Sequence, residues 1–466
     1  MSLHALSPLD TRYKEQTQTL TPYLSEYALM KYRVLVECEY VIALTETKGL
    51  GIKKVTSQEK KLLRSIYTNF SDDDFETIKR FEAETRHDVK SVEYFLKGKL
   101  KGTSGERLLE WVHFGLTSSD INACAYALML GGALQQVLVP ALLEVRNTLG
   151  AYAHAYAKLP MLARTHGQSA SPTTYGKECA VFTARLDEIL DEIEAYKPAL
   201  KLNGATGNYN ALALALPQVP WVQWSEQFGA TLASIARTKL VVSLVTTQID
   251  SHDTYAHVAS LFHRANTIML DCVQDFWRYC SDDYVKLAAK KGEVGSSTMP
   301  HKVNPIDFEN AEGNIATANA LFEMYMRKLP VSRLQRDLSD STVERTFGVA
   351  FGHTLLAYRS ALRGFSRITP NDAALAADLE KHPEVISEGI QTVFRAQGVP
   401  VPYETLKQMT RGVAVTLDDF TQFINTLSVP DAVKQHLKKL TPQTYTGIAS
   451  TIARRVPRVR KAKFTK

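Results

Sequence analysis

The 466-residue sequence has few of the residues that usually carry covalent or metal chemistry. It contains only five cysteines, an odd number with no CxxC pair: Cys38, Cys124, Cys179, Cys272 and Cys280. This pattern argues against a disulfide framework and against a cysteine zinc site. Because most of these cysteines lie in apolar helical patterns, we interpret them as reduced, buried thiols of a cytoplasmic protein.

Several motifs that identify cofactor, metal or nucleophile sites are also absent. The sequence has no GxGxxG or GxxxxGK(S/T) phosphate loop, no HExxH metal motif and no GxSxG nucleophile elbow. Its N-terminus has no basic stretch followed by an apolar one, so we expect no signal peptide. We therefore expect neither a cofactor nor a metal, and a reaction on a charged substrate carried by serine, histidine and lysine.

Long apolar runs are nearly absent. The longest covers residues 123–143 and is interrupted only by Gln135 and Gln136. It contains Gly131, Gly132 and Pro140, and the chain has no similar partner segment, which favours a buried core helix over a membrane span. We expect no membrane association.

Acidic residues are missing from the last thirteen positions, 454–466, which hold seven Lys and Arg. The whole chain has 55 Lys and Arg against 49 Asp and Glu, a net charge of +6, so this tail supplies all of the excess. The nearly neutral body gives no reason to expect a nucleic-acid partner. We interpret the tail as a solvated, disordered end.

Segments with a helical period make up most of the rest. Apolar residues recur in steps of three and four from Phe182 to Tyr196, and again from Val258 to Tyr279. The second helix is expected to begin near Asp253, as an N-cap, and to end before Gly292. Because strand patterns are scarce, we predict an all-α protein centred on a long helical bundle.

Two short stretches have the composition of domain boundaries. Residues 97–106 are rich in Lys and Gly, and the chain turns again at residues 369–371. We predict an N-terminal helical domain over 1–106 and a central long-helix domain over 107–368. The remainder, 369–466, is predicted to be a C-terminal helical domain that ends in the basic tail.

Five polar segments interrupt the helical pattern: 85–88, 117–120, 164–168, 292–305 and 333–345. Taken singly, each has an ordinary structural explanation, such as a surface turn for 292–305, a helix cap for 117–120, or a core histidine at His87 or His166. However, loops as long as 292–305 between long helices are often functional. Together the five segments carry hydrogen-bonding and cationic groups suited to an anionic ligand.

Residues 295–305, GSSTMPHKVNP, match the GSSxMPxKxNP motif of the fumarase/aspartase superfamily of fumarate-forming lyases. Other segments resemble the adenylosuccinate lyases within it: 7–13 (SPLDTRY), 85–89 (TRHDV), 117–122 (TSSDIN), 164–168 (RTHGQ), 203–210 (NGATGNYN), 246–249 (TTQI) and 336–345 (RDLSDSTVER). The resemblance is collinear from about residue 7 to about residue 450, and only the tail looks peculiar to this chain.

The resemblance implies cleavage of a C–N bond in adenylosuccinate, which gives AMP and fumarate. It also implies cleavage of SAICAR, the succinyl-carboxamide intermediate of purine synthesis, to AICAR and fumarate. The fold it implies has three mostly helical domains in each subunit of a homotetramer. The central helices of the four subunits would associate in one bundle, and each active site would draw residues from three subunits.

By the same resemblance, Ser296 is the base that removes a carbon proton and His166 is the acid that protonates the leaving nitrogen. The aci-carboxylate formed between these steps must be held by fixed donors or cations. A serine base requires a stabilised alkoxide, for which Lys302 and the backbone N–H groups of its loop are the available candidates. We expect the loop to close over the substrate.

The substrate-binding residues implied by the resemblance fall into groups by the part of the substrate they suit. The succinyl carboxylates suit Ser297, Lys302, Asn304, Thr117 and Ser118. The 5′-phosphate suits Arg12, Tyr13, Arg336, Ser341 and Arg345, and His87 is expected to contact the phosphate or to support His166. The expected set is completed by Arg86, Asp88, Gln248, Val303, Asn310 and Thr342.

Two alternatives stay open at this point. A sister lyase such as argininosuccinate lyase would share the serine loop and the central histidine motif, but not Arg12–Tyr13 or the segment 341–345. A non-catalytic helical scaffold or an RNA-binding protein is suggested by the length, the helix content and the basic tail. The intact set of Ser296, His166, Lys302 and Asn304 argues against a scaffold.

Overall fold

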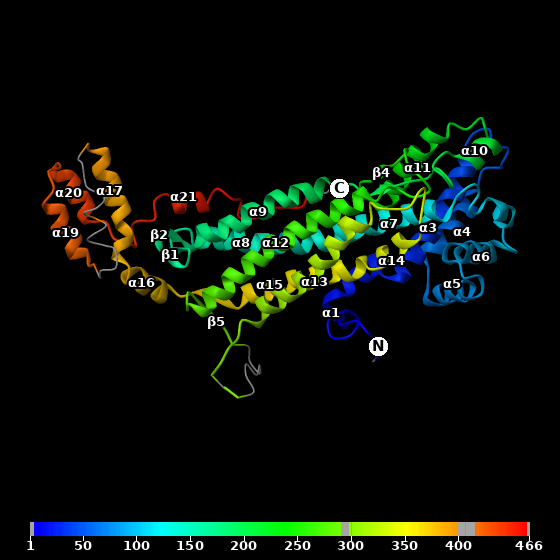
Figure 1. The fold of residues 1–466 in the computed structure, drawn as a ribbon. Helices are drawn as coiled ribbons and strands as arrows, with labels where there is room; N and C mark the ends of the chain where they lie inside the picture. The colour runs from blue at the N-terminus through cyan, green and yellow to red at the C-terminus, as the bar shows by residue number, and fades with distance from the viewer. Residues whose placement is uncertain (1–3, 290–297, 300, 399–405, 407–414, 464–466) are drawn as a thin grey trace.

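The computed structural model describes residues 4–289, 298–299, 301–398, 406 and 415–463. Its helices form an elongated molecule in which a long bundle carries a group of shorter helices at each end (Figure 1). The strands of the described residues are short and pair only in twos. The predicted all-α class is therefore confirmed.

The bundle is built from the long helices of the middle of the chain. They are α7 (Ser118–Ala133), α8 (Val139–Ala155), α9 (Tyr175–Ala195), α12 (Asp253–Ser281), α13 (Ile306–Lys328) and α15 (Phe347–Ser366). The helix α13 packs along both α12 and α15, and α8 packs along α9. Phe262, Phe322 and Phe351, one from each of α12, α13 and α15, meet in mutual ring contacts inside the shared apolar core.

The two periodic segments are helices, as predicted. In α9, Leu186, Ile189 and Ile193 are buried at the expected spacing. The helix α12 ends at Ser281, well before Gly292. Its N-cap is His252 rather than Asp253, and the backbone of His252 is left-handed, with φ of 59°.

The apolar run 123–143 lies inside a continuous helical segment, as predicted. A π-helical turn, Leu134–Leu138, joins α7 to α8. The turn comes just before Pro140, whose ring nitrogen has no hydrogen to donate to the carbonyl four residues earlier. By length and composition alone the segment Ser118–Ala155 could cross a membrane, but 72% of its most apolar window is buried in the fold.

The N-terminal end of the molecule has its own apolar core. It contains α3 (Glu26–Glu46), α4 (Ser57–Thr68), α5 (Asp72–Thr85), α6 (Asp88–Leu100) and η3 (Glu106–Trp111). Two later helices, α10 (Asn210–Ala215) and α11 (Trp221–Ala236), contribute to the same core. A short parallel pair, β3 (Ala199–Leu200) with β4 (Val241–Val242), lies nearby. The first elements of the chain, η1 (Pro8–Asp10), α1 (Lys14–Thr17), η2 (Gln18–Leu20) and α2 (Thr21–Leu24), lie along the bundle instead, where η1, α1 and α2 contact α15. The domain limits at 106 and 368 stay a prediction.

The other end of the molecule is formed mainly by the C-terminal helices and has a third, smaller core. They are α16 (Asp372–Glu380), η5 (Pro383–Ile386), α17 (Ser387–Ala396), α19 (Leu417–Asn425), α20 (Asp431–Lys438) and α21 (Ala449–Ala453). Two antiparallel pairs are found at this end: the hairpin β1 (Pro160–Thr165) with β2 (Gln168–Thr174), and β5 (Val285–Leu287) with β6 (Ile368–Pro370).

The basic tail is ordered through residue 463, and the interpretation of the tail as a disordered end is wrong. After α21 the chain runs back along α9 toward the middle of the bundle (Figure 1). The guanidinium of Arg460 binds Asp187, Asp191 and Glu194 at 3.4, 2.8 and 2.5 Å. Those acids lie four and three residues apart on one face of α9, so they form a matched acidic stripe for the tail.

All five cysteines are free thiols, and all but Cys280 are buried. This agrees with the interpretation of the cysteines as reduced core residues.

Candidate active site

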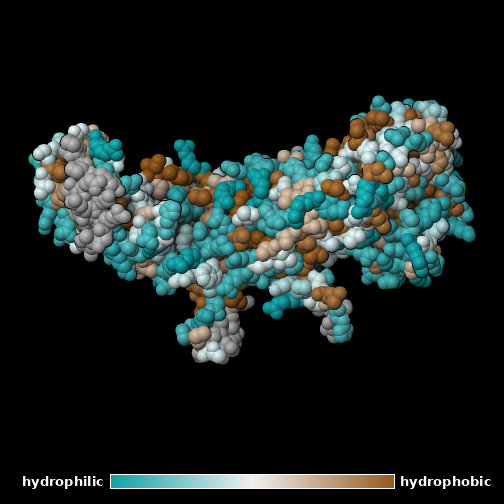
Figure 2. All heavy atoms as spheres, in the orientation of Figure 1, coloured by the Kyte–Doolittle hydropathy of each residue, from teal (hydrophilic) through white to brown (hydrophobic). Residues whose placement is uncertain are grey.

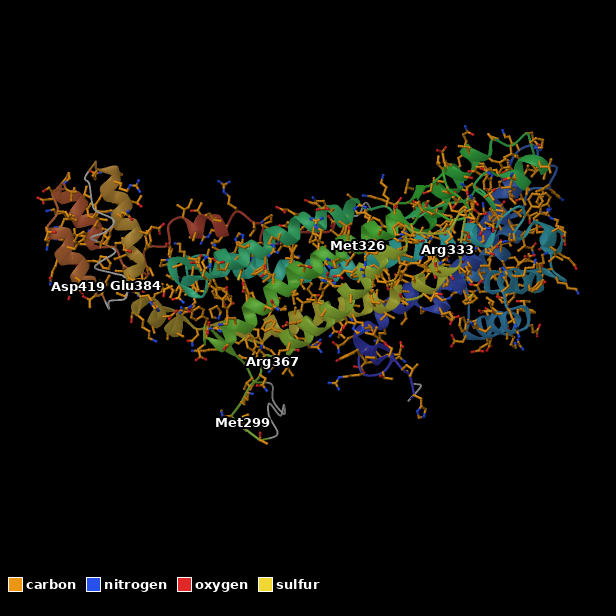
Figure 3. The ribbon with its side chains drawn as sticks, viewed as in Figure 1. Met299, Met326, Arg333, Arg367, Glu384 and Asp419 are labelled. Atoms are coloured by element: carbon orange, nitrogen blue, oxygen red, sulfur yellow. The ribbon has the colours of Figure 1, made fainter. Side chains whose placement is uncertain are left out.

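The expected base lies in a segment that the structure describes only in part. Ser296 and Ser297 are outside the described residues. The neighbouring residues 298–299 and 301–305, which we call the projecting loop, stand out from the bundle between β5 and α13, with Met299 near the tip (Figure 3). Lys302 and Val303 are exposed there, and Asn304 is half-buried.

Two arginines at the C-terminal end of α15 hold the base of the projecting loop, where Arg367 is seen in Figure 3. Arg367 donates to the carbonyl of Ala288, on the incoming side, at 3.2 Å and pairs with Asp307, on the outgoing side, at 3.3 Å. Arg363 pairs with the same carboxylate at 3.1 Å. The two ends of the loop are therefore tied to one helix end, which the sequence motif did not reveal.

His166 occupies the tip of the β1–β2 hairpin and is exposed. Thr165 pairs with Gln168 across the turn, so His166 and Gly167 are its two central residues. Both have positive φ, 53° and 75°, as a type I′ turn requires. The alternative of a buried core histidine is thereby excluded for His166, because the backbone presents its side chain to solvent.

The hairpin is held in place from the C-terminal end of the molecule. Arg164, two residues before His166, pairs with Asp378 of α16 at 2.8 Å. Across the hairpin, the hydroxyl of Ser169 lies 3.0 Å from a ring nitrogen of His382. These contacts fix the strands on both sides of the turn and leave the turn itself free to meet another surface.

A second group of expected residues gathers around α14 (Ser339–Glu344), at the opposite end of the bundle. Asp88 is its centre. The carboxylate of Asp88 binds Arg33, whose side chain is fully buried, at 2.7 Å, and Arg345 at 2.9 Å. Burial alone would raise the pKa of Asp88, but Arg33 and Arg345 together hold that pKa below its ordinary value. The segments 85–88 and 336–345, far apart in sequence, therefore meet.

The neighbours of Asp88 are placed by helix ends. Arg86 is the left-handed C-cap of α5, and His87 is the N-cap of α6. The Nδ1 atom of His87 accepts a hydrogen bond from the N–H of Lys90 at 3.1 Å. Since Nδ1 is engaged and the residue is exposed, its Nε2 atom is the group that faces solvent. The core-histidine alternative is wrong for His87 as well.

Gln248 joins this group through Arg336. The side-chain oxygen of Gln248 accepts a hydrogen bond from Arg336 at 3.3 Å. On α14, Ser341 is half-buried and Thr342 is exposed, and the carbonyl of Ser341 accepts from Arg345 at 2.9 Å. We call Asp88, Gln248, Arg336, Ser341 and Arg345 the α14 wall.

The segment 117–120 caps a helix, so the structural explanation suggested for it from the sequence is confirmed. The same segment also anchors a buried charge. Thr117 is the N-cap of α7, and its N–H donates to Asp120 at 2.8 Å. Asp120 pairs with Lys201 at 2.7 Å, and neither side chain is exposed. Lys201 also donates to the carbonyls of Gly204 and Gln248, each at 2.8 Å. Thr117 and Ser118 are thus fixed relative to the α14 wall.

Arg12 and Tyr13 lie at the start of the chain, against the beginning of α13. The guanidinium of Arg12 lies 5.7 Å from the centre of the Tyr13 ring. The amide of Asn310 donates to the Tyr13 hydroxyl at 3.4 Å and its oxygen accepts from Ser360 at 2.6 Å. Three expected site residues are thereby brought together at the foot of the projecting loop.

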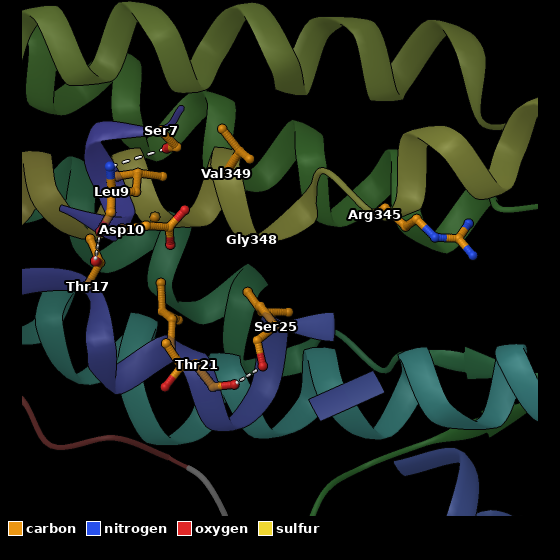
Figure 4. Close-up of a pocket in the computed structure, with 12 residues that line it drawn as sticks. Ser7, Leu9, Asp10, Thr17, Thr21, Ser25, Arg345, Gly348 and Val349 are labelled. Carbon is orange, nitrogen blue, oxygen red and sulfur yellow. Dashed lines mark hydrogen bonds between the residues drawn. The ribbon is translucent and has the colours of Figure 1, made fainter. Parts of the chain in front are cut away.

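A pocket lies between the start of the chain and α15. Ser7, Leu9 and Asp10 line it on one side, Gly348 and Val349 on another, and Arg345 stands at its edge (Figure 4). The pocket therefore connects the N-terminal segment that carries Arg12 with the α14 wall.

Within one chain, however, the residues of the expected site do not all lie together. The hairpin tip with His166 and the α14 wall lie at opposite ends of the bundle (Figure 1). The structure thus brings together Asp88, Gln248, Arg336, Ser341 and Arg345, but it does not place His166 beside them.

Three residues that complete these arrangements were missed in the sequence: Arg33, Lys201 and His252. All are buried charged or titratable groups. No sequence motif marks them, because what distinguishes them is the carboxylate that each one meets in the fold. In the part of the chain that the structure describes, no group of three or more His, Cys, Asp or Glu could hold a metal ion.

Comparison with known proteins covers nearly the whole chain. A family model described as "Lyase" matches residues 11–319, and one described as "Adenylosuccinate lyase C-terminal" matches residues 332–446. The adenylosuccinate lyase of Dictyostelium discoideum is 47% identical over 96% of this chain and 97% of that protein. That of Legionella pneumophila (strain Corby) is 44% identical over 97% and 98%, and that of Escherichia coli K12 is 42% identical over 97% and 98%.

The fold is also shared more widely. The crystal structure of 3-carboxy-cis,cis-muconate lactonizing enzyme from Pseudomonas putida matches with a TM-score of 0.72 over 94% of this chain and 96% of that one, at 20% identity. At that identity the likeness concerns the fold alone. The full-length relatives decide the family: this chain belongs to the adenylosuccinate lyases.

Proposed function

We propose that this lyase cleaves the C–N bond of adenylosuccinate to give AMP and fumarate, and that of SAICAR to give AICAR and fumarate. The observation that carries the proposal is the match, over nearly the full length of both chains, to relatives named adenylosuccinate lyase. A sister lyase such as argininosuccinate lyase is disfavoured because the C-terminal match is to the adenylosuccinate lyase model in particular.

The reaction assigned here is a β-elimination that needs one base and one acid. Ser296, as the alkoxide, removes the proton from the carbon beside one carboxylate, and the charge passes into that carboxylate. The electron pair left by the broken C–H bond then forms the double bond of fumarate and expels the nitrogen. His166, in its charged form, gives the departing nitrogen its proton, so atoms and charge balance without a metal or cofactor step.

The α14 wall is assigned to the 5′-phosphate of the substrate. Arg336 and Arg345 supply guanidinium groups that suit phosphate, and Ser341 supplies a hydroxyl donor. His87, with a free ring nitrogen beside Asp88, is assigned to the same end. Arg12 and Tyr13 complete the phosphate set across the pocket that borders Arg345.

The opposite part of the substrate, the succinyl group, is assigned to short polar donors and a cation. Thr117 and Ser118 lie at the N-terminus of α7, where helix N–H groups favour a carboxylate. Lys302 and Asn304 of the projecting loop, with Ser297 beside them in sequence, supply the remaining donors.

We further propose that the active unit is a homotetramer whose sites are shared between subunits. The separation of His166 from the α14 wall supports this, because one chain alone does not assemble the site. Large apolar side chains are also exposed beside the wall: Val245 at 101%, Leu334 at 88%, Leu338 at 70% and Val331 at 62%. Figure 2 shows hydrophobic surface gathered over α10 and α11 at the same end, where Leu214 is 86% exposed. Such surface is typical of subunit interfaces.

We also propose a cytoplasmic location, and the cysteines are the basis for it. Five unpaired thiols suit a reducing compartment. Cell fractionation with an antibody against the chain would check it, and recovery from a secreted or membrane fraction would contradict it.

The function is tested by incubating the purified protein with adenylosuccinate, SAICAR and argininosuccinate in separate reactions and following fumarate release. We expect release from the first two and none from the third. Release from argininosuccinate alone would overturn the assignment, and release from none of them would return the scaffold alternative to consideration.

A further inference from the structure

The short helix α14 carries the phosphate-binding residues of the α14 wall but has almost no apolar anchor of its own. Among its six residues, Ser339–Glu344, only Val343 is apolar. Leu338, just before the helix, is 70% exposed. Hydrophobic burial alone therefore does not fix the position of α14 against the bundle.

Its buried face is instead acidic. Asp340 and Glu344 lie four residues apart, on the same face of the helix, and are only 5% and 6% exposed. Two carboxylates buried side by side repel each other and lose their hydration, so they require a donor or cation from the surrounding fold.

His252 contacts both of these carboxylates. Its Nε2 atom lies 3.4 Å from the carboxylate of Asp340 and 3.8 Å from that of Glu344. The ring is buried and stacks on Tyr255 of α12, with the ring centres 5.0 Å apart and the planes 13° from parallel. The left-handed backbone at His252, φ 59°, is a conformation that non-glycine residues rarely adopt.

The opposite face of α14 presents the residues assigned to the substrate. Ser341 and Thr342 project there, and Arg345 follows the last turn. Arg345 reaches Asp88 at 2.9 Å, so the segment is held on one side by Asp88 and on the other by His252.

We propose that His252 is a positioning residue for substrate recognition: by bridging Asp340 and Glu344 it holds α14 so that Ser341 and Arg345 face the 5′-phosphate. The inference rests on the proposed function, because it takes the α14 wall to bind that phosphate. His252 touches no substrate atom in this scheme, and it acts through the helix.

The test compares a ligand that has the phosphate with one that lacks it. Binding of AMP and of adenosine is measured by calorimetry on the full-length wild type and on His252→Gln. We expect the substitution to weaken AMP binding about tenfold, the size of one lost charge-assisted contact, and to leave adenosine binding within about twofold. In turnover of adenylosuccinate, KM should rise by a similar factor while kcat stays within about threefold.

Three further variants separate positioning from a loss of folding. Glu344→Gln keeps the shape of the side chain but replaces the carboxylate beside His252 with an amide, so it should weaken AMP binding in the same direction by a smaller factor. If His252 acts through Glu344, adding His252→Gln to Glu344→Gln should cost less than it does in the wild type. His263→Gln is the control: this half-buried histidine of α12 contacts Glu323 of α13 rather than α14, and its substitution should leave the ratio of AMP to adenosine affinity unchanged.

An unchanged ratio of AMP to adenosine affinity in both His252→Gln and Glu344→Gln would overturn the inference. So would a fall in kcat with KM unchanged. Failure of the proposed function is a separate result: in that case the wild type itself would not bind AMP or release fumarate from adenylosuccinate.

Discussion

The two ends of the bundle carry chemistry-bearing residues in opposite ways. At the α14 wall the charged groups are paired within one chain, and buried charges lie behind them, as in the contacts of Arg33 with Asp88 and of Lys201 with Asp120. At the hairpin tip, His166 is exposed, and only the strands around it are held. The charged groups of the wall find their partners within one chain, whereas the hairpin tip faces solvent.

This difference corresponds to the two tasks of the proposed site. A phosphate that does not react is best bound by groups fixed in advance, because ordering them during binding would reduce affinity. An acid that must reach a substrate held by another subunit is best placed on a rigid projection. Substitutions should therefore affect the two ends differently: stability and binding at the wall, and turnover at the hairpin.

The largest effect is expected at the hairpin tip. His166→Gln removes the proposed acid but keeps the polarity and the turn, so adenylosuccinate turnover should fall by about 10²–10⁴-fold, the usual contribution of a general acid. AMP affinity and thermal stability should stay near those of the wild type. They are measured by calorimetry and by melting, with His263→Gln as the control. A loss of AMP binding equal to the loss of turnover would contradict the division between the two ends.

The same variant tests whether the two ends meet across subunits. Arg345→Ala is expected to weaken substrate binding at the wall. When it is unfolded and refolded together with His166→Gln, mixed assemblies of the proposed kind would contain some sites with both side chains intact, so activity should rise above that of either variant alone. No recovery, in mixtures confirmed to contain both chains, would mean that each site is built within one subunit.

At the wall, the largest effect should be on stability. Lys201→Met leaves Asp120 buried without its cation, a change that costs about 3–5 kcal/mol of unfolding free energy. The variant should also release the Gln248 segment, because Lys201 binds its carbonyl. Denaturant unfolding measures the loss. The control is Arg264→Ala, whose partner Glu192 is exposed and which should cost less than about 1 kcal/mol.

If Lys201→Met unfolded like the wild type, the wall would not be fixed in advance, and the contrast between the ends would fail. An equal loss of unfolding free energy in Arg264→Ala would also contradict the contrast, because burial would then not be what distinguishes the Lys201 pair.

The next largest expected effect is a pH dependence of stability that comes from Glu344, on the buried face of α14. Burial, together with the charge of Asp340, raises the pKa of Glu344 from its ordinary 4.5 to about 7, although His252, Arg345 and Arg33 oppose the shift. Because the folded pKa is the higher one, the stabilising contribution is complete below pH 4.5 and is lost as pH rises toward and through 7. The full change is about 3 kcal/mol.

Unfolding of the wild type and of Glu344→Gln at several pH values between 5 and 8 tests this. The stability of the wild type relative to the variant should decline across that interval. His252 works in the same direction: burial alone would lower its pKa, but Asp340, Glu344 and Asp250 raise it overall. The exposed Glu323→Gln should leave the pH dependence unchanged, and a constant difference between wild type and Glu344→Gln would contradict the assignment.

The contrast between the ends also explains what could be predicted from sequence. Helix positions follow from local periodicity, so α9 and α12 were predictable from the spacing of residues such as Leu186 and Phe276. The polar motifs were visible because they interrupt that periodicity. Which charges pair was not visible, because Lys201 meets Asp120 across 81 positions and its role depends on the whole fold.

The same reasoning accounts for the error at the tail. Its seven basic residues suggested solvation as long as no partner was considered. The partner, Asp187, Asp191 and Glu194, was present as an acidic face of a helix that was itself predicted correctly. A comparison of charged faces between segments, rather than charge counts within each, would have indicated the contact.

The smallest predicted effect concerns this tail and tests how the hairpin is supported. The β1–β2 hairpin joins α8 to α9, and the tail bridges the same two helices. Arg460 binds the acidic stripe on α9, while its N–H donates to Asn147 of α8 at 2.8 Å. The carbonyls of the tail also pass so close to Gly150 of α8 that a Cβ there would lie 2.7 Å from one of them.

Arg460→Ala should therefore cost about 2 kcal/mol of unfolding free energy, because it leaves the buried Glu194 without its cation, whereas Asp187 and Asp191 keep Arg146 and Lys463. Arg458→Ala, which changes an exposed tail residue, should cost less than about 0.5 kcal/mol. Since Arg164 and Ser169 hold the hairpin from the C-terminal helices independently of the tail, kcat in Arg460→Ala should stay within about twofold. A much larger fall in kcat would show that the position of the hairpin, like that of the wall, depends on charges buried along the bundle. The two ends would then differ only in how strongly they depend on such charges.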